Sequence, residues 1–206
     1  MDGLGQAQRR LIVGISGASG VVYGLRTLQL LRNAGIETHL VMSKTAEVTF
    51  AHETNFKIAE VKAAAHMVYR IDDMAARIAS GGFRTAGMIV APCSIRSMSE
   101  ISTGATSTLL TRAADVTLKE RRRLVLMVRE TPLHAGHLRT MAALSEMGAI
   151  IAPPVPAFYA KPQTLEDMID ITLGRILDLF AIAGPPLRRW GEDLDLKRRS
   201  SPDGLI

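Results

Sequence analysis

The sequence has a single cysteine and few aromatic residues. Of its 206 residues only Cys93 carries a thiol, which excludes a disulfide framework and a zinc site built from cysteines. Phenylalanine, tryptophan and tyrosine make up 4% of the chain, too few for the stacking platforms that bind single-stranded nucleic acid. No apolar run approaches the length of a membrane span, and residues 1–10 lack the apolar core of a signal peptide. We therefore expect a cytoplasmic protein that binds neither membrane nor nucleic acid.

What remains is the composition of an ordinary globular domain, with 47% hydrophobic and 22% charged residues. The chain length allows one domain with a sizeable core. Its 25 basic residues exceed its 20 acidic ones, a net charge of +5, which suits phosphorylated small molecules. The densest basic clusters, residues 119–123 and 197–199, are not interleaved with aromatic residues, so a nucleic-acid surface is disfavoured. We expect a flexible leader over residues 1–10, one domain over 11–192 and a disordered tail over 193–206.

Short apolar runs alternate with stretches of helical periodicity along this domain. Strands are predicted at residues 11–15, 37–42, 66–70, 87–91, 124–128 and 149–152. Helices are predicted at residues 21–31, 46–52, 58–65, 74–79, 95–101, 106–120, 135–146 and 165–180. This alternation is typical of a parallel sheet covered by helices on both faces. The predicted fold is a single-domain α/β, Rossmann- or flavodoxin-like three-layer sandwich.

The first predicted strand leads into a turn of small residues, Ser16 to Gly20, and then into a helix. Such a unit directs backbone N–H groups and a helix N-terminus at an anion. Gly14, Gly17 and Gly20 are three residues apart and meet the Gly-x-Gly-x-x-Gly pattern only in part. On this stretch alone, phosphate binding and a small-residue turn without a ligand are equal alternatives.

Ligands of an open parallel sheet bind at the carboxyl ends of its strands, so the residues that follow each strand are candidates. They are Gly17-Ala18-Ser19, Ser43-Lys44, Cys93-Ser94-Ile95-Arg96-Ser97, Arg129-Glu130 and Pro156-Ala157-Phe158-Tyr159. Hydroxyls, cations, a carboxylate and a phenol in these places fit a phosphorylated ligand with acid–base chemistry beside it. For Ser19 and Ser43, helix capping is the competing interpretation.

Several blocks of the sequence resemble the UbiX family of flavin prenyltransferases, in the family's order and spacing. They are GISGASG at residues 14–20, Ser43-Lys44, Pro92-Cys93-Ser94, RAADV at 112–116, LKERR at 118–122, RETPL at 129–133, Phe158-Tyr159, RIL at 175–177 and RWGE at 189–192. The resemblance covers residues 11–192. It implies transfer of the dimethylallyl group of dimethylallyl monophosphate to N5 and C6 of reduced FMN. The product, prenylated FMN, would serve a UbiD-type decarboxylase.

The resemblance also implies roles for individual residues. FMN would be held by Gly17, Ala18, Ser19, Ser43, Ser94, Ile95, Arg96, Ser97 and Arg112. Tyr159 and Arg175 would bind the prenyl phosphate, and the expected catalytic residues are Glu53, Lys119, Arg129, Glu130 and Trp190. No metal is implied, and the family's site forms where subunits of a dodecamer meet. Ile95-Arg96-Ser97 stands where many members have Met-Lys-Thr, and Ala157 stands where glycine is common, which leaves the pathway served open.

Some of these residues have a plainer interpretation. Arg112 is three residues from Asp115 and could form a structural ion pair with it, and Trp190 could anchor the tail. Lys119 belongs to a basic cluster that would complement a helix dipole. His134 and His137 lie three apart on a predicted helix, but no third metal ligand accompanies them, so we take them as ordinary helix residues. Cys93 follows a proline, where a nucleophile could lie, but burial is expected.

Two other functions compete with prenyl transfer. A flavin-dependent cysteine decarboxylase usually carries a Pro-Ala-Met-Asn motif, which this sequence lacks. A flavin-carrying accessory subunit of an aromatic-acid decarboxylase needs only the flavin pocket. The presence of Glu53, Lys119 and Glu130, besides Tyr159 and Arg175, argues against a mere carrier.

Overall fold

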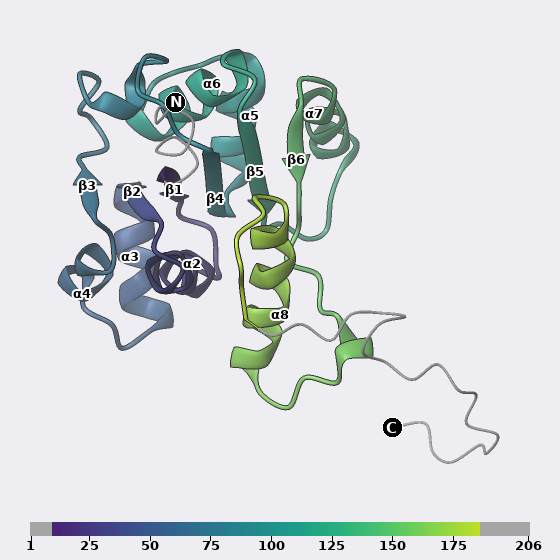
Figure 1. Cartoon of the computed structure of the whole chain (residues 1–206). Helices are drawn as coiled ribbons and strands as arrows, with labels where there is room; N and C mark the ends of the chain where they lie inside the picture. Colours follow the sequence, from purple (N-terminus) through teal and green to yellow (C-terminus); the bar gives the residue numbers. More distant parts are fainter. Residues whose placement is uncertain (1–9, 186–206) are drawn as a thin grey trace.

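The computed structural model describes residues 10–185 and contains one sheet of six parallel strands (Figure 1). The strands are β1 (Arg10–Ile15), β2 (Glu37–Met42), β3 (Met67–Tyr69), β4 (Gly87–Cys93), β5 (Arg123–Val128) and β6 (Ala149–Ile151). Their order is β3-β2-β1-β4-β5-β6. The chain therefore builds one half of the sheet outward from β1 and then returns to build the other half from β4. The carboxyl ends of β1 and β4 form the switch point where sheets of this kind bind ligands.

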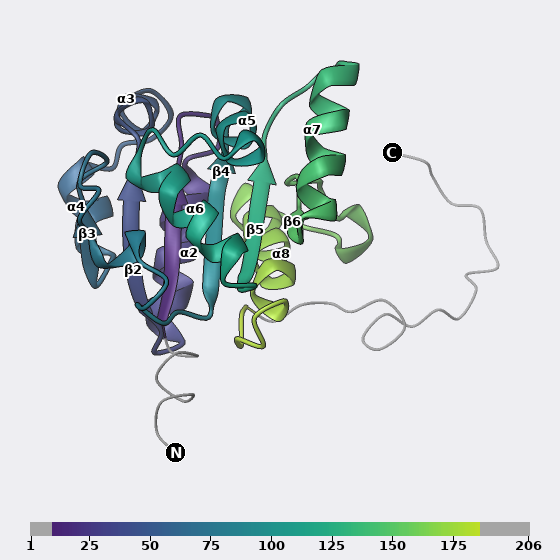
Figure 2. The ribbon, with the colours of Figure 1, turned by 90° about the horizontal axis from the view of Figure 1, so that it is seen from above.

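Helices cover both faces of the sheet, as Figure 2 shows. They are α2 (Val22–Asn33), α3 (Lys44–Glu53), α4 (Ile58–Ala63), α5 (Ile95–Thr103), α6 (Leu109–Lys119), α7 (Ala135–Glu146) and α8 (Leu165–Asp178), with 3-10 turns η1 (Arg77–Ala79) and η2 (Phe158–Ala160). Helices α2 and α8 pack on one face, and α5, α6 and α7 on the other. Within residues 10–185, no helix has the length and apolar character needed to cross a membrane. The predicted α/β sandwich is confirmed.

The central strands are buried along most of their length. Every residue of β4 is buried, and β1, β2 and β5 each bury five of their six residues. Leu28 and Leu177 pack against the sheet from α2 and α8. Met98 and Leu110 do the same from α5 and α6. Because side chains on both faces of the strands are buried, the strands are continuous apolar runs in the sequence.

Two predictions about local structure are wrong. Residues 74–79 form turns and the short η1 instead of a helix, and the Asp73 carboxylate accepts a hydrogen bond from the N–H of Ala75 at 3.2 Å. Such a side-chain bond favours a turn over a helix. Strand β4 continues through Pro92 to Cys93, where we expected the proline to end it. The register of the β4–β5 pair shifts between Val90 and Cys93, and such an irregularity tolerates a residue without an N–H.

Three elements begin or end at residues other than the expected ones. Strand β1 begins at Arg10, one residue inside the expected leader. Helix α6 begins at Leu109, three residues later than the start of the predicted helix, and α8 ends at Asp178. Trp190 and the tail beyond residue 192 lie outside the described residues.

Candidate functional site

A cavity of about 430 Å³ opens at the carboxyl edge of the sheet, where β1, β2 and β4 end. We call it the main cavity. Its lining residues are Ser16, Gly17, Ser43, Lys44, Thr45, Ile71, Ser94, Arg96, Ser97, Glu100, Thr108 and Leu110. Five of the residues predicted to hold FMN are therefore brought together here: Gly17, Ser43, Ser94, Arg96 and Ser97. Their sequence neighbours Ala18, Ser19 and Ile95 are next to the lining but not part of it.

Three helices begin at the main cavity, and each is capped by a hydroxyl group. Ser43 Oγ accepts from the N–H of Ala46 at 3.1 Å at the start of α3. Ser94 Oγ accepts from the N–H of Ser97 at 3.2 Å at the start of α5. Thr108 Oγ1 caps α6 in the same way. Because a helix N-terminus carries partial positive charge, three of them around one cavity favour a multiply charged anion such as phosphate.

Thr108 and Ile71 were missed by the sequence analysis. Ile71 follows β3 closely, so the rule of inspecting strand ends, applied to this short strand, would have found it. Thr108 precedes the apolar pair Leu109-Leu110 as a capping residue does. Thr108 was overlooked as a cap because the predicted helix begins at residue 106, three residues before the observed start of α6, and so includes it.

The side chain of Ser16, which lines the main cavity, connects the end of β1 to the end of β4. Its hydroxyl donates to the carbonyl oxygen of Pro92 at 2.9 Å and accepts from the N–H of Ser94 at 2.7 Å. The side chain is almost fully buried, so water does not compete for these bonds. The end of β1 and the loop after β4 are thereby fixed against each other, at the switch point of the sheet.

The first turn after β1 needs glycine at two positions. A Cβ atom on Gly17 would lie 2.4 Å from Cβ of Thr45, so the turn passes directly against the start of α3. Gly20 has φ of +91°, a conformation that favours glycine. The N–H groups of Gly20 and Val21 donate to the Glu53 carboxylate at 2.8 and 3.3 Å. The anion at the start of α2 is therefore a side chain of the protein itself.

The two residues predicted to bind prenyl phosphate are neighbours. Arg175 Nη1 lies 3.5 Å from Tyr159 Oη, the first on α8 and the second on η2. Helix α8 is fixed to α2 by Arg26, which donates through Nε and Nη2 to the Asp170 carboxylate, both at 2.7 Å. Neither Tyr159 nor Arg175 lines the main cavity.

Arg129 and Glu130 follow β5 directly, and both side chains are exposed. The N–H of Arg129 donates to the carbonyl oxygen of Cys93 at 3.1 Å, which places Arg129 beside the loop that carries Ser94. Glu130 accepts from the N–H of Thr131 at 3.0 Å. The two residues thus lie at the carboxyl edge of the sheet, as the main cavity does.

Lys119 lies at the opposite edge. Helix α6 starts at the main cavity with Thr108 and runs back across the sheet to Lys119, just before β5 begins at Arg123. There the Lys119 ammonium group pairs with the Glu120 carboxylate. Lys119 therefore does not line the main cavity of a single copy of the chain.

Arg112 forms the ion pair that was its plainer interpretation. Its Nη1 is 2.8 Å from Asp115 Oδ2, and its Nε donates to the carbonyl oxygen of Ala79 at 3.2 Å. The side chain fixes α6 to η1 and does not line the main cavity. Its flavin contact stays a prediction.

The surroundings of the single thiol and of the histidine pair, as far as residues 10–185 form them, show neither a nucleophile nor a metal site. Cys93 is fully buried, and burial raises its pKa to about 12, so the thiol is not poised as a nucleophile. The ring centroids of His134 and His137 are 3.6 Å apart with the planes tilted by 30°, and His134 Nδ1 accepts from the N–H of Gly136 at 3.0 Å. In the described part of the chain, no three His, Cys, Asp or Glu side chains are grouped to hold a metal.

Known proteins resemble this chain closely. The model of the Flavoprotein family matches residues 5–178. Flavin prenyltransferase UbiX of Escherichia coli K12 is 57% identical over 185 residues, which are 88% of this chain and 98% of the relative. The UbiX enzyme of Thauera aromatica is 52% identical over 181 residues, with 88% and 93% covered. The chain belongs to the UbiX flavin prenyltransferases of the Flavoprotein family.

Solved structures of the UbiX family share the fold. A crystal structure of AnUbiX (PadA1) with FMN and dimethylallyl pyrophosphate superposes with a TM-score of 0.87 at 50% identity, covering 88% of this chain and 97% of that one. A dodecameric FMN-dependent UbiX-like decarboxylase from Escherichia coli O157:H7 superposes with a TM-score of 0.86 at 48% identity, covering 88% and 98%. The resemblance drawn from the sequence blocks is confirmed.

Proposed function

We propose that this protein transfers the dimethylallyl group of dimethylallyl monophosphate to N5 and C6 of reduced FMN. The observation that carries the proposal is the main cavity, in which three capped helix N-termini meet five of the residues expected to hold FMN. FMN here is a substrate, and the product is prenylated FMN. A UbiD-type decarboxylase in the cytoplasm is the recipient that we propose for the product.

The lining of the main cavity fits FMN. Its volume of about 430 Å³ is that of an ordinary small-molecule site. Helix N-termini and the hydroxyls of Ser43 and Ser94 suit the phosphate, and the absence of a side chain on Gly17 lets a ligand approach the backbone. Leu110 and Ile71 supply apolar surface for a flat ring system. When bound in its reduced form, the flavin supplies the nucleophilic N5 and C6 positions.

The work of the protein is to stabilise the charges that develop as phosphate leaves an allylic carbon. The carbon–oxygen bond breaks with its electrons on the phosphate, so negative charge grows there and positive charge grows on the hydrocarbon. Lys119, Arg129 and Arg175 stabilise the leaving phosphate, and the aromatic face of Trp190 stabilises the allylic cation. By analogy with a lost oxyanion donor, removing one such cation costs about 2–4 kcal/mol of transition-state stabilisation.

Proton transfer completes the reaction. N5 loses its proton when it bonds to the allylic carbon. The bond to C6 then consumes the carbon–carbon double bond of the prenyl group, whose inner carbon takes up a proton, and the hydrogen on C6 leaves as a proton so that the ring regains aromaticity. Glu130 is the proposed acceptor, with the departed phosphate as the alternative base, and Glu53 is the second carboxylate near the reacting centre. Exchange of the proton through Glu130 with solvent is possible because its side chain is exposed in the single chain.

We further propose that copies of this chain assemble, as a dodecamer, to complete the site. Lys119 lies at the amino edge of the sheet, so a neighbouring copy must supply it to the main cavity. Large apolar side chains project from α7, from the loop after β6 and from α8, with Leu138 54%, Val155 69%, Phe158 73% and Leu165 73% exposed. Contact between copies would cover this surface. The dodecameric state of the relative from Escherichia coli O157:H7 supports assembly of this chain into a dodecamer.

In the decisive experiment, the purified protein is incubated with FMN, a reductant and dimethylallyl monophosphate, and the molecular mass of the released flavin is then measured. We expect an increase in mass by one prenyl group. A parallel reaction with dimethylallyl diphosphate measures the donor preference. Unmodified flavin with intact FMN binding would favour the competing function of a non-catalytic flavin carrier. Decarboxylation of a peptide with a C-terminal cysteine, tested in the same preparation, would favour the cysteine decarboxylase.

A further inference from the structure

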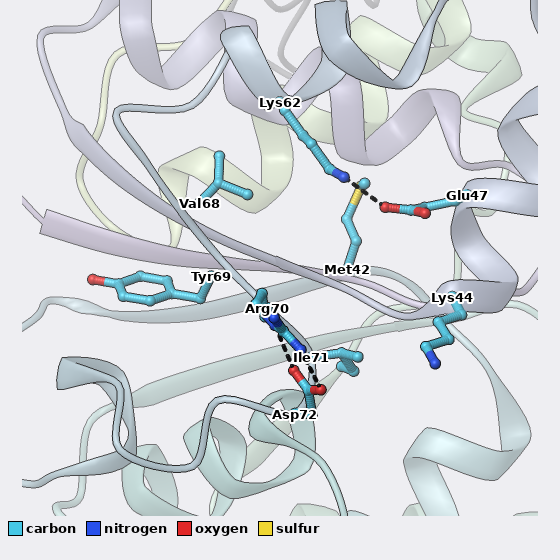
Figure 3. Close-up of a pocket in the computed structure, with 9 residues that line it drawn as sticks. All are labelled: Met42, Lys44, Glu47, Lys62, Val68, Tyr69, Arg70, Ile71 and Asp72. Carbon is cyan, nitrogen blue, oxygen red and sulfur yellow. Dashed lines mark hydrogen bonds and ion pairs between the residues drawn. The ribbon is translucent and has the colours of Figure 1, made fainter.

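A second cavity, of about 310 Å³, adjoins the main cavity and shares Lys44 and Ile71 with it (Figure 3). We call it the side cavity. It lies between α3, α4 and the end of β3, and its lining residues are Met42, Lys44, Glu47, Lys62, Val68, Tyr69, Arg70, Ile71 and Asp72. Lys44 therefore lies at the boundary between the main cavity and the side cavity. It is the first residue of α3, immediately after the capping Ser43.

Every other charged group of the side cavity is paired with a neighbour. Lys62 Nζ lies 2.8 Å from Glu47 Oε1. Arg70 donates to both carboxylate oxygens of Asp72, through Nε at 3.0 Å and Nη2 at 2.8 Å. Within each of these two pairs, the positive and the negative charge neutralise each other.

The same holds in the main cavity. Arg96 Nε donates to Glu100 Oε1 at 2.8 Å, and Glu100 also accepts from Ser107. Lys44 makes no hydrogen bond or ion pair with any residue of the described range 10–185. In Figure 3 its ammonium group is turned away from the Lys62–Glu47 pair. Among the charged side chains that line the two cavities in the described part of the chain, Lys44 is thus the one without a hydrogen-bonded or ion-paired partner. The hydrogen bonds from Arg70 lower the pKa of Asp72, and the charge of Lys44 helps to lower it further.

We propose that Lys44 binds the phosphate of FMN and makes the site selective for the mononucleotide over riboflavin. The inference rests on the proposed function and adds to it a role for Lys44, a residue that belongs to one of the resembling sequence blocks but to which the resemblance assigns no role. Phosphate esters carry close to two negative charges at neutral pH. Helix N-termini contribute only partial charges, and the Arg96 guanidinium already has a carboxylate partner. The Lys44 ammonium group supplies the missing full charge beside the Ser43 cap.

Replacing Lys44 should weaken binding of FMN, which has a phosphate group, but not of riboflavin. A hydrogen bond to a charged group contributes about 1.5–3 kcal/mol, so Lys44→Met should weaken FMN binding about 10- to 100-fold. Riboflavin has no phosphate, so its affinity should not change. Lys44 is exposed and bonded to no described side chain, so its replacement should leave the fold intact. Lys44→Arg keeps the charge and should retain most of the preference for FMN.

The experiment measures dissociation constants of FMN and riboflavin by titration of flavin fluorescence. It uses the wild-type protein, Lys44→Met, Lys44→Arg and the control Lys62→Met. Lys62 lines the side cavity but is paired with Glu47, so its variant should bind both flavins as the wild type does. The wild-type affinity for FMN should fall with added salt, and that of Lys44→Met should fall less.

Three results would overturn the assignment of Lys44. They are unchanged FMN binding by Lys44→Met, an equal loss of FMN and riboflavin, and the same loss in Lys62→Met. Failure of the proposed function has a different signature. A wild-type protein that binds FMN through Lys44 but forms no prenylated flavin would refute prenyl transfer alone. A wild-type protein that binds neither flavin would refute both.

Discussion

The carboxylate of Glu53 accepts a hydrogen bond from the backbone N–H of Gly20 at 2.8 Å. The same oxygen accepts from the N–H of Val21 at 3.3 Å, so the last residue of α3 closes the turn at the start of α2. Negative charge at this place is favourable because it faces the positive end of a helix. A residue expected to take part in the chemistry is therefore also a structural link between the first two βα units.

Substitution of Glu53 separates these two roles. Glu53→Ala removes the cap, and we expect the free energy of unfolding to fall by about 1 kcal/mol, as for other lost caps. Glu53→Gln keeps an oxygen that can accept from Gly20, so most of the stability should remain. If the carboxylate is catalytic, prenyl transfer falls in both variants. Urea denaturation and the flavin mass assay measure the two effects, and full activity in Glu53→Gln would leave Glu53 with a structural role only.

The Tyr159–Arg175 pair gives a prediction about the prenyl donor. Arg175→Ala should reduce kcat/KM for dimethylallyl monophosphate by the equivalent of about 2–4 kcal/mol, because one cation on the leaving phosphate is lost. FMN binding should be nearly unchanged, because Arg175 does not line the main cavity. Initial rates at varied donor concentration and a flavin titration provide the comparison.

Arg32→Ala is a matched control for that variant. Arg32 is an exposed arginine in the last turn of α2, and it is not among the residues proposed for FMN binding, donor binding or catalysis. Its variant should use the donor as the wild type does. Parallel loss of donor use and FMN affinity in Arg175→Ala would show that Arg175 is misassigned.

A buried histidine makes the stability depend on pH. His39 on β2 is fully buried, with Nδ1 2.9 Å from Tyr69 Oη and Nε2 3.1 Å from Glu37 Oε1. Burial lowers the pKa of His39, and the nearby Glu37 carboxylate offsets this only in part. The unfolded chain therefore takes up this proton first as the pH falls. The contribution of neutral His39 to stability is complete above the unfolded pKa of about 6.5 and is lost progressively below it.

We therefore expect the free energy of unfolding to decline as the pH is lowered from about 7 toward 5. In His39→Gln the decline over this range should be shallower, although the variant is less stable at neutral pH because it loses packing and a hydrogen bond. His52→Gln is the control, because His52 is exposed at the end of α3. Equal pH slopes in the wild type and His39→Gln would contradict the assignment.

The apolar runs of the sequence predicted the strands well because these strands are buried on both faces. The strand-end rule then found Ser43 and Ser94, whose positions depend only on the adjacent strand. It could not place Lys119, which ends α6 just before β5 begins and does not line the main cavity. Lys44 was noted at a strand end, but its importance depends on the pairing of Lys62 and Arg96 with their partners. Such pairing is a property of the folded surface and leaves no pattern in the sequence.

The tight contact at Gly17 provides the last prediction. A Cβ atom there would lie 2.4 Å from Cβ and 2.5 Å from Cγ2 of Thr45, at the start of α3. Real atoms do not approach so closely, so Gly17→Ala must displace the turn or α3, at a cost of about 1–3 kcal/mol for overpacking. The displacement moves the Ser43 cap, so FMN affinity should fall together with stability. Gly82→Ala is the control, since the nearest atom to its added Cβ is 3.6 Å away. Thermal melting and flavin titration test both variants, and wild-type behaviour of Gly17→Ala would mean that the turn yields without disturbing the cavity.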